Sequence, residues 1–334
     1  MTTAVVDTDF ILHAVACAGE KRYVDVIHKA SGRKLRVDNK TQFYGSWQRK
    51  DGGILAEINR AKGKDWTWED FEYIDVQEPE PLENVLHSAK VMFESVVKRA
   101  GCSKYKAFIG DGKPTFRNEL ATILEYKGNR KDLISPIYKD EVRDYLVRKF
   151  KVVTVSGIEA DDACIIEAFK KKDHVVIAVD KDTGGNAVNW FNPNHEEDGV
   201  VNCDQFGKLW LNNKNEVRGI GRLFFYYQCA YGDDVDNYRA NSASDKRWGS
   251  KSAYKALVGC QNDKEALEAL VGVYKSLYPE PKMITGWRGD EFEIDWLYVA
   301  SENWQLARML RSMDELTNRI ELEDVLCKVG VKYD

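Results

Sequence analysis

Four short apolar segments, each followed by acidic residues, constrain the fold of this chain more than any other feature. The segments are residues 4–6, 105–110, 151–156 and 174–179, and helical patterns of apolar residues lie between them. Such alternation of strand and helix patterns predicts an α/β domain with a mostly parallel central sheet. With 334 residues, of which 43% are hydrophobic, the chain is long enough for one large α/β domain with additions.

Carboxylates follow each predicted strand at its carboxyl end. They are Asp7, Asp111, Glu159, Asp161, Asp162, Asp180 and Asp182. Ligands of open α/β sheets bind at the carboxyl ends of the strands, so we expect these side chains to converge. A further acidic run, residues 232–237, contains Asp233 and Asp236. Each acid taken alone is also explained as a turn cap or as a residue that complements a helix dipole.

The convergence of so many acids predicts bound cations, because neighbouring carboxylates otherwise repel one another. Carboxylate oxygens are hard ligands, which Mg²⁺ and Mn²⁺ prefer. Two such ions about 4 Å apart are the usual apparatus for in-line displacement at a phosphodiester. The sequence therefore predicts a site for two divalent cations and hydrolysis at phosphorus.

The overall composition argues against several other classes of protein. A formal net charge of −5 argues against nucleic-acid binding through bulk basicity, although local basic surfaces stay open. The seven cysteines form no CxxC pair and are odd in number, which argues against a disulfide framework or a zinc ribbon. No apolar run reaches the length of a membrane span. We expect a soluble cytoplasmic protein, in a host cell if the chain is viral, with no membrane partner.

The remaining patterns predict the domain organisation. Residues 20–80 break the strand–helix alternation, with a hairpin whose turn lies at Ser31-Gly32 and an extended segment over residues 66–76. Helical patterns dominate after Gly232, most clearly over residues 251–259, 263–278 and 303–316. We therefore expect a core domain over residues 1–230, with a β-rich insertion at 20–80, and a helical region over residues 231–334.

Five motifs, taken in order, resemble the 5′→3′ exonuclease and flap endonuclease family, most closely its bacteriophage members. The motifs are Asp7, GDGKPTFRNELATILEYKGNRK (110–131), GIEADDA (157–163), VDKD (179–182) and GDDVDN (232–237). The resemblance covers residues 4–15 and 105–260. It implies a PIN-like core with a basic helical arch over residues 113–150 and a helical duplex-binding region with a helix-turn-helix-like motif. The implied activity is metal-dependent hydrolysis of DNA phosphodiester bonds during phage replication.

The resemblance also assigns roles to individual residues. It places two Mg²⁺ or Mn²⁺ ions among Asp7, Asp111, Glu159, Asp161, Asp162, Asp180, Asp182, Asp233 and Asp236. It makes Lys127 and Arg130 the catalytic pair at the scissile phosphate, where their charge stabilises the transition state. It gives substrate binding to Tyr126, Lys113, Arg117, Lys131, Gly249 and Lys251. A solvated basic helix face is the alternative for Lys127 and Arg130, and core packing is the alternative for Tyr126.

The implied partners are DNA with 5′ ends, flaps or nicks, RNA–DNA hybrids and replication proteins, and the protein is expected to be a monomer. Family members often bind K⁺ at a glycine-rich turn, but Arg247 stands here in place of the first glycine, which weakens the case for K⁺. The segment VDKDTG also resembles the motif of haloacid-dehalogenase-type phosphatases. A catalytically inactive DNA-binding protein and a PIN-like ribonuclease are further alternatives.

Overall fold

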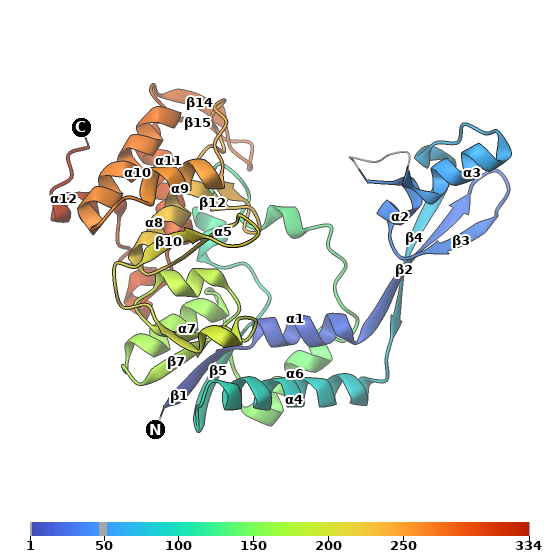
Figure 1. The fold of residues 1–334 in the computed structure, drawn as a ribbon, viewed down its shortest axis with the longest axis horizontal. Coiled ribbons are helices and arrows are strands. Elements are labelled where there is room, and N and C mark those ends of the chain that lie inside the picture. The colour runs from blue at the N-terminus through green and yellow to red at the C-terminus, as the bar shows by residue number, and fades with distance from the viewer. Residues whose placement is uncertain (1, 47–51, 334) are drawn as a thin grey trace. The chain divides into compact units, whose positions relative to one another are not determined.

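The computed structural model describes residues 2–46 and 52–333. The main sheet of the protein has six strands (Figure 1). Its strands are β1 (Thr3–Asp7), β5 (Lys104–Gly110), β6 (Val153–Val155), β7 (His174–Ile177), β8 (Asn189–Phe191) and β9 (Val200–Asn202). The order across the sheet is β6-β5-β1-β7-β8-β9, and every neighbouring pair is parallel except β8 and β9. The expected α/β class with a mostly parallel sheet is confirmed.

The helix α7 (Ala160–Phe169) packs against β1, β5 and β7. Its buried residues Cys164 and Ile165 share a core with Val5 and Val176 of the strands. Both faces of the central strands are covered, which explains why they read as continuous apolar runs in the sequence. The acidic first turn of α7 complements the positive end of its helix dipole.

The C-terminal half is rich in helices, as expected. It contains α8 (Arg222–Tyr231), α9 (Ser250–Leu257), α10 (Asp263–Leu277), α11 (Trp296–Ala307) and α12 (Leu322–Val329). Three antiparallel pairs of short strands lie before or between these helices: β10–β11 (Lys208–Leu211 and Val217–Ile220) before α8, β12–β13 (Gly232–Asp233 and Tyr238–Arg239) between α8 and α9, and β14–β15 (Lys282–Thr285 and Glu291–Ile294) between α10 and α11. The helix expected over residues 303–316 is wrong in its extent, because α11 ends at Ala307 and only Met313–Leu316 forms a further short 3-10 helix.

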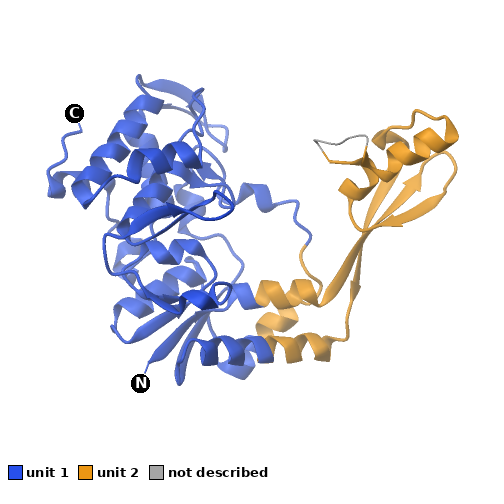
Figure 2. Ribbon diagram, viewed as in Figure 1, with its two compact units in different colours: residues 1–11, 91–134, 145–334 blue, residues 12–90, 135–144 orange. Residues whose placement is uncertain are grey.

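The chain divides into two compact units (Figure 2). Unit 1 comprises Met1–Ile11, Val91–Ile134 and Tyr145–Asp334, and unit 2 comprises Leu12–Lys90 and Ser135–Asp144. The expected boundary after residue 230 does not separate compact units, because Leu223 of α8 shares one hydrophobic core with Tyr274 of α10 and Trp304 of α11. The chain crosses between the units within α1 (Asp9–Ala18), α4 (Leu82–Arg99) and α6 (Lys139–Phe150), and also between Ile134 and Ser135.

Unit 2 contains the β-rich insertion. Its antiparallel sheet has the order β3-β2-β4, formed by Lys34–Val37, Glu20–His28 and Phe71–Pro79. The expected β2–β3 hairpin is confirmed, and Gly32 in its turn has φ +66°, which favours glycine. Two short helices, α2 (Lys40–Tyr44) and α3 (Ile54–Lys62), bury Phe43 and Leu55 in a small core of their own with Val26 and Phe71.

The region expected to form a helical arch, residues 113–150, is not one continuous helix. It consists of α5 (Phe116–Leu120), a 3-10 turn over Gly128–Arg130 and α6, joined by irregular segments. These pieces lie partly in unit 1 and partly in unit 2.

Candidate metal centre and active site

The carboxyl ends of β1 and β7 lie next to each other in the sheet. From β1 the chain continues to β5 on one side of the sheet, and from β7 it continues to β8 on the other side. The carboxyl ends of β1 and β7 therefore form the topological switch point, where open α/β sheets bind ligands. Asp7 ends β1, and Asp180 follows β7 by three residues. The charges of Asp180 and Glu159 both act on Asp7, so the three carboxylates lie near one another.

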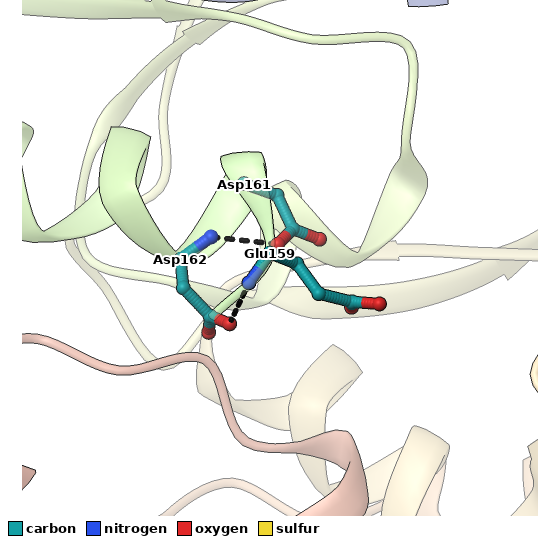
Figure 3. A group of neighbouring side chains, drawn as sticks. All are labelled: Glu159, Asp161 and Asp162. Carbon is teal, nitrogen blue, oxygen red and sulfur yellow. Dashed lines mark hydrogen bonds between the residues drawn. The ribbon is translucent and has the colours of Figure 1, made fainter. Parts of the chain in front are cut away.

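The first turn of α7 gathers three carboxylates, from Glu159, Asp161 and Asp162 (Figure 3). One oxygen of each lies within 4.8 Å of the others. Two local hydrogen bonds fix the turn. The backbone N–H of Glu159 donates to Asp162 at 3.2 Å, and that of Asp162 donates to Asp161 at 2.6 Å.

A second group of carboxylates surrounds Lys181. The Lys181 ammonium lies 2.6 Å from Asp233 and 3.6 Å from Asp182. Asp180 accepts a hydrogen bond of 2.9 Å from the backbone N–H of Asp182, which orients the start of this turn. The charges of Asp180, Asp233 and Asp236 all act on Asp182, so this group is continuous with the strand-end acids.

The segment Tyr126–Arg130 contacts the acidic loop that contains Asp236 through hydrogen bonds and ion pairs. The ammonium of Lys127 hydrogen-bonds Glu159 and lies 3.8 Å from Asp236, and the guanidinium of Arg130 lies 2.7 Å from Asp236. The backbone N–H of Lys127 also donates to the carbonyl of Asp236 at 2.9 Å. Lys127 has φ +58°, a left-handed conformation that non-glycine residues seldom adopt and that recurs at functional sites.

Tyr126 does not offer the stacking surface that the sequence suggested. Its ring is only 3% exposed, and its hydroxyl lies 2.7 Å from a carboxylate oxygen of Asp236 and 3.1 Å from one of Glu159. The core-packing alternative is therefore the better description, with the hydroxyl holding two of the candidate ligands in place. The burial that orients the Tyr126 hydroxyl also keeps its ring from contact with a substrate base.

Arg117 and Asp162 also differ from expectation. The Arg117 guanidinium is buried and donates to both oxygens of the Asp162 carboxylate, at 2.6 and 2.9 Å. It also donates to the carbonyls of Leu306 and Arg308. Asp162 itself is fully buried and accepts a further bond from the backbone N–H of Leu310. By distance Asp162 belongs to the group of three carboxylates, but both of its oxygens already accept hydrogen bonds from Arg117. We therefore propose that Arg117 and Asp162 hold the framework of the site rather than contact substrate or metal.

Burial and mutual repulsion give several of these acids unusual proton affinities. Burial, with the charges of Asp9 and Asp180, raises the pKa of Asp7 to about 8. Burial also raises the pKa values of Asp161 and Asp182 well above their usual range, with the neighbouring charges of Glu159 and Asp180 acting in the same direction. These carboxylates are costly to ionise without a nearby cation.

The two lysines neutralise part of this charge. Burial alone would raise the pKa of Glu159, but Arg117 and Lys127 outweigh it and hold that pKa below its usual range. Burial is likewise outweighed at Asp233, where Lys181 lowers the pKa. Some carboxylates of the centre, such as Glu159 and Asp233, are therefore paired with basic side chains, whereas the pKa values of others, such as Asp7 and Asp161, are raised.

The residues of this centre fit divalent cations. The donors are carboxylate oxygens, the hard ligands that Mg²⁺ and Mn²⁺ select. One oxygen of Asp182, Oδ1, is buried without a hydrogen-bond partner among the described residues and lies 3.6 Å from the Lys181 ammonium, so it has the capacity to coordinate a cation. Asp7, Glu159, Asp161, Asp180, Asp182, Asp233 and Asp236 are the residues that would hold such ions.

The other residues predicted from the sequence lie in less direct positions. Asp111 follows β5 and accepts a hydrogen bond of 2.9 Å from the backbone N–H of Lys113. Lys131 is exposed and pairs with Glu125 at 2.6 Å. Lys251 hydrogen-bonds Asn215 in the β10–β11 turn. Gly249 caps the N-terminus of α9, and open space surrounds the position of its missing Cβ.

Two residues of the centre were missed by the sequence analysis. Lys181 lies within VDKD and has no predicted role, although a lysine between two aspartates can supply a positive charge that balances them. Asp9 lies two residues after Asp7, and its carboxylate accepts weakly from the backbone N–H of Gly110, at 3.3 Å. That bond links the ends of β1 and β5.

No family model matches the chain, and no curated protein matches it. The chain is similar in structure to the phage T5 D15 protein co-crystallised with metal ions, with a TM-score of 0.42 and 18% identity over 73% of this chain and 89% of that one. A lysine-to-alanine mutant of the T5 5′-exonuclease gives a TM-score of 0.41 and 17% identity over the same shares. A pseudo-enzyme–product complex of the T5 D15 flap endonuclease with DNA and metal ions gives 0.37 and 19%, over 55% of this chain and 70% of that one. Among the described residues no helix is long and apolar enough to cross a membrane.

Proposed function

We propose that this protein is a metal-dependent 5′ nuclease, an exonuclease and flap endonuclease that hydrolyses phosphodiester bonds of DNA. One observation carries the proposal: seven carboxylates converge at the switch point of a parallel sheet, and the Lys127–Arg130 segment is attached to them. Anionic ligands for cations and cationic groups for a phosphate thus share one centre. The 5′ polarity and the choice of DNA rest on the order of the five motifs in the sequence.

The proposed reaction is in-line attack of water on phosphorus. The water oxygen forms the new bond to phosphorus, and the bond from phosphorus to the O3′ atom of the upstream nucleotide breaks. The products are a 5′-phosphate on the downstream strand and a 3′-hydroxyl on the upstream strand. Two divalent cations, when bound, supply Lewis acidity and charge neutralisation at the reacting phosphate.

The protein's own groups bind and orient the phosphate. The Lys127 and Arg130 side chains are 28% and 40% exposed. Each can therefore donate hydrogen bonds to non-bridging oxygens of a substrate phosphate. Their charges stabilise the negative charge that develops in the transition state. The Tyr126 hydroxyl orients Glu159 and Asp236, and the buried Arg117–Asp162 pair fixes the turn that contains Glu159 and Asp161.

The finer assignments remain part of the same proposal. Residues 113–150 would guide the single-stranded 5′ end, and Lys113 and Lys131 would contact its phosphates. The α9 segment, with Gly249 and Lys251, would hold duplex DNA through backbone phosphates, without sequence readout. We also propose that the protein acts as a monomer on nicked, flapped and RNA–DNA hybrid substrates. Replication proteins would recruit it to these substrates.

A substrate panel tests the proposed function. The purified chain is incubated with Mg²⁺ and 5′-labelled single-stranded, nicked, flap and RNA–DNA hybrid substrates, and product lengths are measured. We expect short labelled products from 5′ ends and cleavage at the flap junction. Cleavage of p-nitrophenyl phosphate without cleavage of any nucleic acid would instead favour the phosphatase alternative. Binding without cleavage would favour the inactive DNA-binding alternative.

A further inference from the structure

The β-rich insertion in unit 2 contains a pocket of about 200 Å³ that has no part in the centre described above. It opens between the β2–β3 hairpin, α3 and the start of β4. Its lining includes His28, Arg33, Phe43, Lys62, Trp66 and Phe71. All of the lining residues belong to unit 2.

Aromatic rings form one wall of this pocket. The ring centroids of His28 and Trp66 are 4.3 Å apart, and those of His28 and Phe71 are 5.2 Å apart. Phe43 and Phe71 are buried, whereas His28 and Trp66 are partly exposed, so the wall has a closed floor and an accessible rim. The His28 Nδ1 atom lies 2.8 Å from the Ser31 hydroxyl, which fixes the ring orientation.

The charge of the lining is entirely basic. Arg33, Lys34 and Lys62 contribute to it, and the described residues that line the pocket include no Asp or Glu, although the chain as a whole has a net charge of −5. Lys34 pairs with Asp25 at 2.6 Å. Arg33 and Lys62 form no ion pair within the described part of the chain, and the Lys62 ammonium makes a cation–π contact over the Trp66 ring, 5.4 Å from its centre. Two cations without an acidic partner among the described residues therefore flank an aromatic wall.

We propose that this pocket binds one unpaired nucleobase of a single-stranded nucleic acid and that Arg33 and Lys62 bind the flanking phosphates. The proposal rests on the proposed function, because it gives the insertion the same class of ligand. Bases stack on aromatic side chains without regard to sequence, and cations beside the stack bind the backbone. An apolar floor beside Arg33 and Lys62 suits a base joined to phosphates better than an apolar peptide, which would leave both cations without an anionic partner.

Binding in EDTA separates this pocket from any cleavage. Fluorescence anisotropy with a labelled oligothymidylate gives the Kd of the full chain at several salt concentrations. In the double variant Arg33→Ala/Lys62→Ala, we expect the magnitude of the slope of log K against log salt to fall by about 1.4, because two single-strand phosphate contacts are lost. Lys64→Ala is the matched control, since Lys64 is exposed, follows the same helix and does not line the pocket. Its slope should equal that of the wild type.

A second arm tests the base. Trp66→Leu keeps apolar volume but removes the ring, and we expect it to weaken binding by about tenfold, as expected for loss of one base–aromatic stack. An oligonucleotide with 5-iodouracil in place of thymine should crosslink on irradiation to peptides that contain His28, Trp66 or Phe71. Crosslinks confined to other peptides would overturn the proposal. Equal affinity for an oligonucleotide of abasic residues and for oligothymidylate would also overturn the proposal, because binding would then depend on the phosphates only.

The outcomes also separate this pocket from the nuclease proposal. If the Arg33→Ala/Lys62→Ala variant binds like the wild type while Asp180→Asn abolishes cleavage, the pocket proposal is wrong and the nuclease proposal stands. If pocket variants lose single-strand binding and the wild type cleaves nothing, the pocket proposal stands and the nuclease proposal is wrong. Displacement by polyglutamate as readily as by oligothymidylate would show a general anion site and would contradict the base-binding role.

Discussion

The guanidinium of Arg117 donates to both carboxylate oxygens of Asp162, at 2.6 and 2.9 Å, inside the protein. This pair joins α5 to the first turn of α7. The Leu310 backbone N–H, which also donates to Asp162, adds the segment after α11. The position of Glu159 and Asp161 therefore depends on an ion pair that has no contact with solvent.

Removal of Arg117 alone should be strongly destabilising, because it leaves the Asp162 charge buried without its partner. We expect Arg117→Met to lower the free energy of unfolding by about 3–5 kcal/mol. The double variant Arg117→Met/Asp162→Leu, which removes both charges, should recover much of that loss. Urea denaturation of the three proteins measures both effects. Equal losses in the single and double variants would show that the pair is not the source of the stability.

A second prediction concerns acid stability of the insertion. Hydrogen bonds from Arg36 and Lys34 lower the pKa of Asp25 from 3.8 to about 2. The folded-state pKa lies below the unfolded value, so the stabilisation is present above about pH 4 and is lost as the pH falls toward about 2. The thermal midpoint of Asp25→Asn should therefore lie below that of the wild type at neutral pH, and the two should approach each other in acid. A constant difference across this range would contradict the assignment.

The strands and the convergence of acids could be predicted from the sequence because they depend on local pattern. Val5 and Val6 are buried within a covered sheet, and such strands read as unbroken apolar runs. Topology then brings the strand ends to one edge without any information on distant contacts. The positions of Asp7 and Asp180 follow from these two rules alone.

The residues whose surroundings differ from the expectation make contacts between distant parts of the chain. Arg117 and Asp162 are separated by 45 residues, and Tyr126 and Asp236 by 110, so no local pattern shows that they pair. A basic residue near acidic motifs reads equally well as a substrate contact or as a buried counter-ion. The end of α11 at Ala307 has the same cause, since the chain beyond it turns to supply backbone groups to Arg117 and Asp162.

A third prediction tests the acidic centre without substrate. Because the pKa of Asp7 is raised to about 8, ionisation of this group costs stability, and the cost grows as the pH rises from about 4 to about 8. Asp7→Asn keeps the acceptor for the Asp9 backbone N–H and removes the charge. In EDTA at about pH 8 its thermal midpoint should exceed that of the wild type.

Divalent metal should reverse this order. Mn²⁺ at a hundredfold excess over its Kd should stabilise the wild type by about 2.7 kcal/mol and the Asp7→Asn variant by less. If Mn²⁺ shifts neither thermal midpoint and Asp7→Asn gains nothing in EDTA, the carboxylates do not act as one metal centre.

A fourth prediction separates transition-state stabilisation from binding. Lys127→Ala should slow single-turnover cleavage of a flap substrate by about 10²-fold with little change in affinity, because its ammonium acts on charge that develops during the reaction. Lys172→Ala is the control, since Lys172 is exposed and lies outside the centre. Equal losses in rate and affinity for Lys127→Ala would make it a simple phosphate anchor.

The central claim is that the converging carboxylates bind divalent cations for phosphodiester hydrolysis, and cleavage by one variant tests it most directly. Asp182 supplies a buried oxygen that has no hydrogen-bond partner among the described residues, and Asp182→Asn preserves its shape. Single-turnover cleavage of a 5′-labelled flap substrate is measured for both proteins at saturating Mg²⁺ and in EDTA. We predict cleavage at the junction by the wild type with Mg²⁺ only, and none by Asp182→Asn, although its affinity for the flap in EDTA is unchanged. Cleavage by the wild type in EDTA, or an undiminished rate in Asp182→Asn, would contradict the account.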